Sequence, residues 1–207
     1  MTGRLVDAEA ALLRARDLGF LGPGPIDRQV GHALGFARAW DSCSSDPPDS
    51  LVDLGSGGGL PGLVLAAEWP GTSVVLVESM VRRARFLGVI RDELDWPNLA
   101  VEARRAEELG RDPAYRGRVA LVTARGFGPP AATAECGAPL LRLGGRLIVS
   151  EPPDDRDRWP EAPLATLGLL PEGRIRAPAG YIVLRQERLA PEGFPRRVGQ
   201  PTKRPLF

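Results

Sequence analysis

The stretch LVDLGSGGGLPGLVLA, residues 51–66, constrains what this chain can fold into more than any other part of it. Four glycines fall within the five positions 55–59, directly after a short apolar run. An apolar run bounded by turn residues is typical of a buried strand, and glycine lets the backbone turn sharply and approach a ligand closely. The stretch therefore predicts a ligand site at the end of a strand.

The rest of the chain alternates between strand-like and helix-like segments, a pattern that builds a parallel sheet with helices on both faces. We expect an α/β, Rossmann-like doubly wound sheet that is mostly parallel and has an antiparallel last pair of strands. Asp7 is expected to cap the first helix, Gly19 to end it, and Pro61 to open the helix after the glycines. Residues 151–163 are expected to form a solvated loop. The expected helices cover residues 7–18, 27–40, 81–94 and 131–141, with one more from residue 61, and the expected strands cover residues 51–54, 73–77, 99–102, 119–123, 146–149, 173–176 and 181–188.

Length and composition limit the organisation of the chain. With 207 residues, 43% of them hydrophobic, we expect one domain over residues 1–207, with an N-terminal helical extension at 1–50 and a basic tail at 190–207. The net charge of +1 gives no overall basic field, so nucleic-acid binding must rest on a local patch. Cys43 and Cys136 fit no metal or disulfide spacing, and the first twenty residues carry neither a secretory signal nor a membrane span. We therefore expect a cytoplasmic protein with no metal ion and no membrane partner.

Three ligand classes use glycine-rich turns, and the residues around this turn distinguish them. A triphosphate-binding loop requires Gly-Lys-Ser/Thr, whereas here Gly62 is followed by Leu63. A dinucleotide fingerprint is formally present, since the residues from Gly57 to Gly62 match G-x-G-x-x-G. Asp53 precedes the turn, however, and a pyrophosphate is disfavoured by a nearby anion, whereas S-adenosylmethionine carries an ammonium and a sulfonium. Together with the acid Glu78 after the second strand, the pattern favours S-adenosylmethionine.

Each candidate residue also has a simpler interpretation. Asp53 could accept N–H groups within the turn, and Glu78 could be a solvated surface acid. If Glu78 is functional, its two oxygens accept the two ribose hydroxyls. Arg125 is a candidate because the carboxyl ends of parallel strands form the ligand crevice, and its alternative is a strand-end ion pair. Ala106 and Glu107 follow the strand at 99–102, where the chain would pass an adenine, although an ordinary helix start has the same pattern.

Several stretches resemble the RsmG (GidB) family, bacterial methyltransferases that act on ring nitrogen 7 of a guanine in small-subunit (16S) ribosomal RNA. They are VDLGSGGGLPGLVLA, ESMVRRARFL, RAEEL, TARGFGPPAATAECGAPLLRLGG and FPRRVGQPTKRPL, in this order from about residue 51 to the C-terminus. The last stretch is the most specific, because a Pro-Arg-Arg-x-Gly-x-Pro-x-Lys tail is not general among methyltransferases. The resemblance implies a class I methyltransferase fold with S-adenosylmethionine as cofactor.

The resemblance also implies roles for individual residues. Arg125 would be the catalytic residue, acting by positioning cofactor and target, because guanine nitrogen 7 has a free lone pair and no proton to lose. The residues expected to bind the cofactor are Asp53, Gly55, Gly57, Leu60, Glu78, Ala106, Glu107 and Arg125. The tail residues expected to hold the ribosomal RNA, either free or in the assembling 30S particle, are Arg196, Arg197, Lys203 and Arg204, which stand in the sequence without an acid.

Alternatives of a different class stay open. Ser150-Glu151 stands where the family usually has Lys-Gly, and residues 26–34 match the family only in part. These departures leave room for a methyltransferase that acts on another RNA or on a small molecule. The glycine pattern alone also leaves a nicotinamide enzyme or a non-catalytic nucleotide binder. For the tail, a disordered solubilising end is the simpler interpretation.

Overall fold

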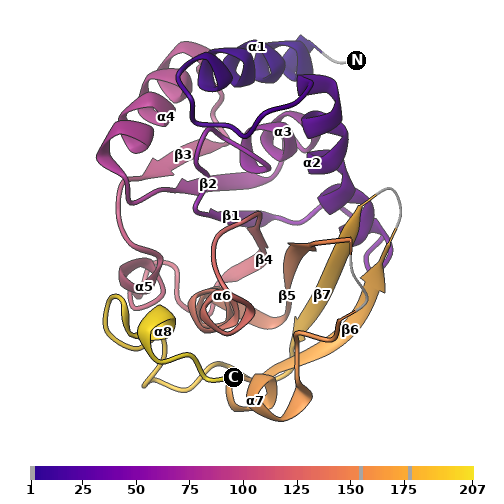
Figure 1. Ribbon diagram of the computed structural model, residues 1–207, viewed down its shortest axis with the longest axis vertical. Helices are drawn as coiled ribbons and strands as arrows, with labels where there is room; N and C mark the ends of the chain where they lie inside the picture. The colour runs from indigo at the N-terminus through magenta and orange to yellow at the C-terminus, as the bar shows by residue number, and fades with distance from the viewer. Residues whose placement is uncertain (1–2, 154–155, 177–178) are drawn as a thin grey trace.

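A computed structural model describes residues 3–153, 156–176 and 179–207 (Figure 1). A seven-stranded sheet runs through it in the order β3-β2-β1-β4-β5-β7-β6. The helices are α1 (Gly3–Asp17), α2 (Ile26–Asp41), α3 (Gly62–Glu68), α4 (Val81–Leu94), α5 (Ala106–Leu109), α6 (Pro130–Gly137), α7 (Glu161–Thr166) and α8 (Gln200–Lys203). The strands are β1 (Ser50–Leu54), β2 (Ser73–Val77), β3 (Leu99–Glu102), β4 (Val119–Ala124), β5 (Leu141–Glu151), β6 (Leu169–Ile175) and β7 (Gly180–Gln186).

The strands from β1 to β5 pair in parallel, whereas β7 pairs antiparallel with both β5 and β6. The expected doubly wound sheet with an antiparallel end is therefore confirmed. Strands β1 and β4 are adjacent although β2 and β3 lie between them in the sequence, so the chain reverses its direction of winding at this point. In open α/β sheets, ligands bind beside the carboxyl ends of the strands at this reversal.

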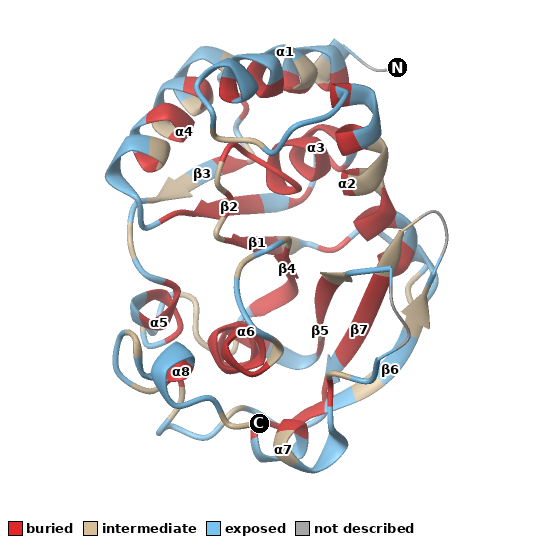
Figure 2. Ribbon diagram, viewed as in Figure 1, coloured by how far each residue is buried: buried red, intermediate tan, exposed pale blue. Residues whose placement is uncertain are grey.

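Two helical layers bury the two faces of the sheet (Figures 1 and 2). Side chains alternate between the faces because successive residues of a strand point in opposite directions. Leu51 of β1 and Val74 of β2 pack in one core with α1, α2, α3 and α4, while Val52 and Val75 pack in a second core with α5, α6 and α7. The central strands are buried on both sides, which fixes the positions of their carboxyl ends.

Several boundaries differ from the sequence expectations. Asp7 lies inside α1, which is already helical at Gly3, so the prediction that Asp7 caps this helix is wrong. Helix α6 ends at Gly137 and continues as a 3₁₀ turn, Ala138–Leu140, because Pro139 has no N–H to extend an α-helix. Strand β5 is longer than expected and β6 begins earlier, at Leu169.

The stretch at residues 151–163 is not simply a solvated loop. Trp159 is 2% exposed, and its indole Nε1 donates a hydrogen bond of 2.7 Å to Glu151 Oε1. Helix α7 begins two residues later, and its Leu164 is fully buried. Burial of these apolar groups anchors the stretch, whereas residues 154–155 lie outside the described residues. In the described part of the chain, no helix is long and apolar enough to cross a membrane.

Candidate functional site

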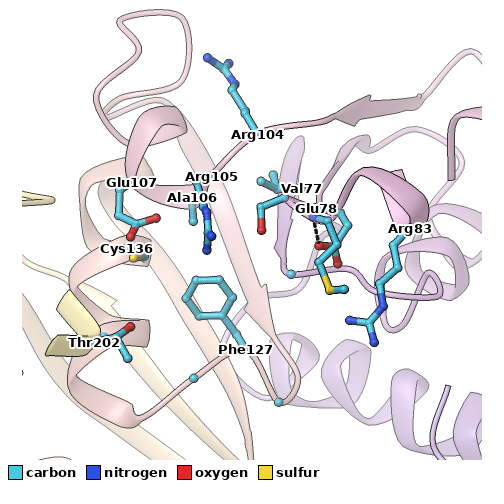
Figure 3. A pocket seen from close by; sticks show the side chains of 16 residues that line it. Val77, Glu78, Arg83, Arg104, Arg105, Ala106, Glu107, Phe127, Cys136 and Thr202 are labelled. Carbon is cyan, nitrogen blue, oxygen red and sulfur yellow. Dashed lines mark hydrogen bonds between the residues drawn. The ribbon is translucent and has the colours of Figure 1, made fainter. Parts of the chain in front are cut away.

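A pocket of about 310 Å³, the main pocket, lies at the carboxyl edge of the sheet (Figure 3). Its walls are segments that follow different strands, so residues distant in the sequence face one cavity. They are Gly55 after β1, residues 77–80 at the end of β2, Arg83 of α4, residues 104–107 after β3, residues 126–128 after β4, Ala132 and Cys136 of α6, and Thr202 of α8. This volume is at the lower end of the range for small-molecule sites.

The glycine turn forms one side of the main pocket. Gly55 has φ +66° and Gly57 has φ +57°, a left-handed conformation that side chains other than glycine adopt at a cost. A Cβ on Gly55 would lie 2.8 Å from Cδ2 of Phe127, so the ring of Phe127 lies directly against this glycine. The ring of Phe127 occupies the space that a side chain at position 55 would need, and the expected close approach of a ligand stays a prediction.

Asp53 is the residue of β1 that precedes the glycine turn, and it stabilises the turn through hydrogen bonds. Its side chain is completely buried, with Oδ1 accepting from Thr123 Oγ1 at 2.9 Å and Oδ2 accepting from the Gly62 N–H at 3.2 Å. Burial raises the pKa of the Asp53 carboxyl to about 6, against the lowering effect of its hydrogen bonds. Asp53 does not line the main pocket. Both oxygens of this acid therefore accept hydrogen bonds from β4 and from the start of α3, and its role toward the cofactor stays a prediction.

Glu78 forms the wall next to the turn, directly after β2. Its Oε2 accepts from the Gly57 N–H at 3.0 Å, and its Oε1 accepts from the Met80 N–H at 2.7 Å. The side chain lines the main pocket although the residue is only 5% exposed. Each carboxylate oxygen has two lone pairs, so each can accept a second hydrogen bond from a ligand. The surface-acid alternative is excluded by this burial.

The opposite wall combines Ala106, Glu107, Cys136 and Thr202 (Figure 3). Glu107 is 8% exposed, and its Oε1 accepts from the Gly199 N–H at 2.9 Å. Burial raises the pKa of the Cys136 thiol, and the nearby acids raise it further, which keeps this sulfur uncharged. The structure thus brings Ala106 and Glu107 to the pocket, facing Glu78 across it.

A second cavity of about 240 Å³, the side hollow, adjoins the main pocket through Gly55, Arg83 and Gly126. Gly57, Leu60 and Arg125 line it, so every expected cofactor residue except Asp53 faces one of the two cavities. Burial lowers the pKa of the Arg125 guanidinium, while Tyr181 and Asp53 act in the opposite direction. An arginine nevertheless keeps its positive charge in proteins.

His32 lies close to this arginine and is uncharged at neutral pH. Burial, together with the Arg125 charge, lowers the pKa of His32 to about 4. Its ring lies 5.4 Å from that of Tyr181, whose hydroxyl donates a 2.5 Å hydrogen bond to the His32 carbonyl. The histidine is therefore held within an aromatic cluster beside the side hollow.

Comparison with known proteins assigns the chain to a family. Residues 27–162 match the family model of GidB, described as rRNA small subunit methyltransferase G. The chain belongs to this family. A relative named ribosomal RNA small subunit methyltransferase G from Symbiobacterium thermophilum is 34% identical over 88% of this chain and 80% of its own length. The relative of the same name from Roseiflexus castenholzii is likewise 34% identical, over 88% and 80%.

Solved structures support the class I methyltransferase fold of this GidB family member. A Corynebacterium glutamicum protein aligns with a TM-score of 0.58 at 17% identity, covering 86% of this chain and 90% of its own. The antibiotic-resistance methyltransferase Kmr aligns with a TM-score of 0.53 at 18% identity, covering 67% and 87%. At these identities the likeness concerns the fold alone.

Sequence reasoning did not identify Phe127, Cys136 and Thr202, which line the main pocket of this GidB protein. Phe127 follows Arg125 by two residues in the loop after β4, and its ring projects into the middle of the cavity (Figure 3). The strand-end argument that selected Arg125 could have selected Phe127 as well. Cys136 and Thr202 carried no such signal, because one lies within a helix and the other within the tail.

The tail segment, residues 194–204, is folded against α5 and α6 rather than free (Figure 1). Arg196 pairs with Glu135 of α6, whose side chain is completely buried, although residues 194–204 themselves contain no acid. This pair fixes the guanidinium on the protein. Within the described ranges, Arg197, Lys203 and Arg204 are exposed and form no ion pair, and they stay the candidates for RNA contact.

Proposed function

We propose that this protein transfers the methyl group of S-adenosylmethionine to ring nitrogen 7 of a guanine in small-subunit (16S) ribosomal RNA. The observation that carries the proposal is the main pocket, in which Glu78 is fixed by the glycine turn, within a chain that belongs to the GidB family. The relatives are named for methylation of small-subunit ribosomal RNA. Such a substrate implies a cytoplasmic protein.

The residues of the main pocket fit S-adenosylmethionine. The ligand has a ribose and two positive centres, and Glu78 offers an acid with accepting capacity on both oxygens. Gly55 leaves no room for a side chain beneath Phe127, as a turn approached by a ligand requires. When bound, S-adenosylmethionine supplies an electrophilic methyl group. Glu78 would hold the ribose, Ala106 and Glu107 the adenine, and the turn with Leu60 and Arg125 the remainder.

The target atom demands no general base from the protein. Guanine nitrogen 7 carries a lone pair and no proton, so the enzyme contributes alignment and exclusion of water. The groups near the side hollow are consistent with this chemistry, since His32 is neutral with a pKa of about 4 and Arg125 is a fixed cation. Arg125 would orient the cofactor and the target base from the end of β4.

The exposed cations of the tail would hold the RNA backbone. Arg197, Lys203 and Arg204 project from the tail segment beside the main pocket and would contact phosphates. Phosphate contacts position a nucleic acid without reading its sequence. The choice of guanine would therefore be made by the groups around the side hollow.

One experiment tests the proposal directly. The purified protein is incubated with S-adenosylmethionine and either free 16S ribosomal RNA or 30S particles from cells without the modification, and 7-methylguanosine is located by chemical cleavage. We expect one new cleavage site, and its absence from the Arg125→Ala reaction. The substrate that is modified distinguishes free RNA from the particle. Unchanged cleavage with both substrates would contradict the proposal.

Calorimetry separates the alternative functions. We expect binding of S-adenosylmethionine and S-adenosylhomocysteine and no binding of NAD. Cofactor binding without any RNA modification would favour a methyltransferase that acts on another RNA or a small molecule. Binding of NAD alone would overturn the assignment of the main pocket.

A further inference from the structure

The tail segment reaches the main pocket itself. Thr202 of α8 lines the cavity beside Cys136 of α6 and on the same side as Glu107 of α5 (Figure 3). One wall of the pocket is thus built from three segments that are far apart in the sequence. The RNA-binding role expected for the tail does not account for this position.

The first anchor of the tail is the pair of Arg196 and Glu135. The carboxylate Oε1 accepts from the Arg196 backbone N–H and from its Nε, each at 2.8 Å, and Oε2 accepts from Nη2 at 2.6 Å. Glu135 is completely buried, whereas the Arg196 side chain is 26% exposed. A buried carboxylate without its partner is strongly destabilised, so this anchor is costly to release. Cys136, the next residue, lines the pocket.

The second anchor joins the tail to the pocket wall directly. The N–H of Gly199, the residue before α8, donates to Oε1 of Glu107 at 2.9 Å. Glu107 itself lines the main pocket. The position of this acid therefore depends on the tail being docked.

The beginning of the tail is fixed as well. Pro195 is buried, its ring packs 3.0 Å from where a Cβ of Gly110 would lie, and its carbonyl accepts from Arg111 Nε at 2.9 Å. Arg116 Nη1 donates to the Phe194 carbonyl at 2.6 Å. These contacts fix where the tail segment begins and so determine which of its residues contact α5 and α6.

We propose that the docked tail segment is a structural wall of the cofactor pocket, and that Glu135, Arg196 and Thr202 are positioning residues for the adenine end of the cofactor. The inference rests on the proposed function. Both anchors act on this wall, since Glu107 lines the pocket and Glu135 adjoins Cys136, which lines it too. Release of the tail leaves Glu107 without its N–H donor and Glu135 without its countercharge, so the wall rearranges.

The first test places bulk at the wall. Calorimetry measures the Kd of S-adenosylhomocysteine for the full chain, for Thr202→Tyr and for Gln200→Tyr, a matched control because Gln200 is exposed on the same helix outside the pocket lining. We expect Thr202→Tyr to weaken binding at least about tenfold, a loss of about 1.4 kcal/mol. Gln200→Tyr keeps the affinity of the unmodified chain, and both variants keep its thermal midpoint.

The second test releases the first anchor. Arg196→Gln removes the countercharge, and the double variant Glu135→Gln, Arg196→Gln removes both charges, so that it folds even if the single variant does not. Val198→Gln serves as the control, because Val198 is an exposed tail residue. We expect both anchor variants to raise the Kd of S-adenosylhomocysteine and to increase hydrogen exchange at the Gly199 N–H, and the control to change neither.

The outcomes separate this inference from the proposed function. If the unmodified chain does not bind S-adenosylhomocysteine, the proposed function fails. If the unmodified chain binds it, and Thr202→Tyr and the folded anchor variants bind equally well, the tail is not part of the cofactor site and the inference is overturned.

Discussion

The main pocket has a turn side, formed by the glycine turn and Glu78, and a tail side, formed by Glu107 and the tail segment. Each side is held by a hydrogen bond from a glycine N–H to a glutamate, but the two bonds span very different distances in the sequence. On the turn side, Glu78 accepts the N–H of Gly57, 21 residues away. On the tail side, Glu107 accepts the N–H of Gly199, 92 residues away. Glu78 follows a central strand, whereas Gly199 belongs to a surface segment whose Arg196 anchor is 26% exposed. Surface segments open more readily than central strands, so we expect the tail side to be the more labile wall in spite of its buried anchor at Glu135.

The largest effect is expected on the turn side, from Gly55→Val. A branched side chain meets both a positive φ and the ring of Phe127, 2.8 Å from the new Cβ. We expect the affinity for S-adenosylhomocysteine to fall by at least about 100-fold, or about 3 kcal/mol, as measured by calorimetry. Gly71→Val is the control, since Gly71 has no neighbour within 4 Å of a built Cβ. Undiminished binding by Gly55→Val would remove the turn from the cofactor site.

Glu78→Gln is expected to have the next largest effect. The substitution keeps the size of the side chain but turns one accepting oxygen into an amide that faces an N–H, that of Gly57 or of Met80. We expect the Kd of S-adenosylhomocysteine to rise by about 10- to 100-fold, consistent with the loss of a charged hydrogen bond. Glu68→Gln on α3 is a matched control at an exposed position. If anchor variants of the tail weaken binding more than Glu78→Gln does, the ranking of the two walls is reversed.

The stability of the protein should depend on pH through Asp53 of the turn side and His32 of α2, with opposite signs. The pKa of Asp53 is raised to about 6, so its contribution to the free energy of unfolding is present at low pH and is lost as the pH rises towards 6. The pKa of His32 is lowered to about 4, so its contribution is present above the ordinary histidine pKa and is lost as the pH falls towards 4. The two contributions oppose each other between about pH 4 and pH 6.

Single substitutions separate the contributions of Asp53 and His32 to the free energy of unfolding. We expect the free energy of unfolding of Asp53→Asn, measured with urea, to rise with pH over this interval more than that of the unmodified chain. The corresponding free energy of His32→Gln should fall with pH. The slope of each change is on the order of 1 kcal/mol per pH unit at most. Parallel curves for all three proteins would show that neither group titrates in this range.

The smallest effect is expected on the outer surface of the tail. If Arg197, Lys203 and Arg204 each contact a phosphate, the log–log dependence of RNA affinity on salt has a slope of about −2 to −3. Replacement of any one by alanine should reduce the magnitude of this slope by about 0.7 to 0.9, with no change in the Kd of S-adenosylhomocysteine. A filter-binding titration over a series of KCl concentrations measures it. Three unchanged slopes would place the RNA contact elsewhere.

The turn side could be predicted from the sequence because its residues are close together in the chain. The bounds of β2, α4 and β3 were expected as found, and Glu78 lies where the end of a second parallel strand places it. Asp53 was correctly placed before the turn, whereas its hydrogen bonds to Gly62 and Thr123 were not foreseen as a pair. Burial of an acid depends on neighbours such as Thr123 of β4, which is paired beside β1 only in the folded sheet.

The tail side could not be predicted, because its bonds follow no periodic pattern. Arg196 and Glu135 are 61 residues apart, and neither residue type indicates a partner at such a distance. The basic composition of the tail indicated a solvated, RNA-facing segment, and this interpretation holds only for Arg197, Lys203 and Arg204 as a proposal. Long-range ion pairs of single residues are set by tertiary packing, and local sequence reasoning does not reach them.

The separation of the two walls in the sequence also has a consequence for synthesis of the protein on the ribosome. The sheet strands β1 to β4 and the glycine turn emerge well before the tail, and domains begin to fold as the chain is made. The wall that contains Thr202 is absent until residues 196–202 have left the exit tunnel. A nascent chain can therefore assemble the glycine turn early, yet its pocket is complete only once the tail segment has docked.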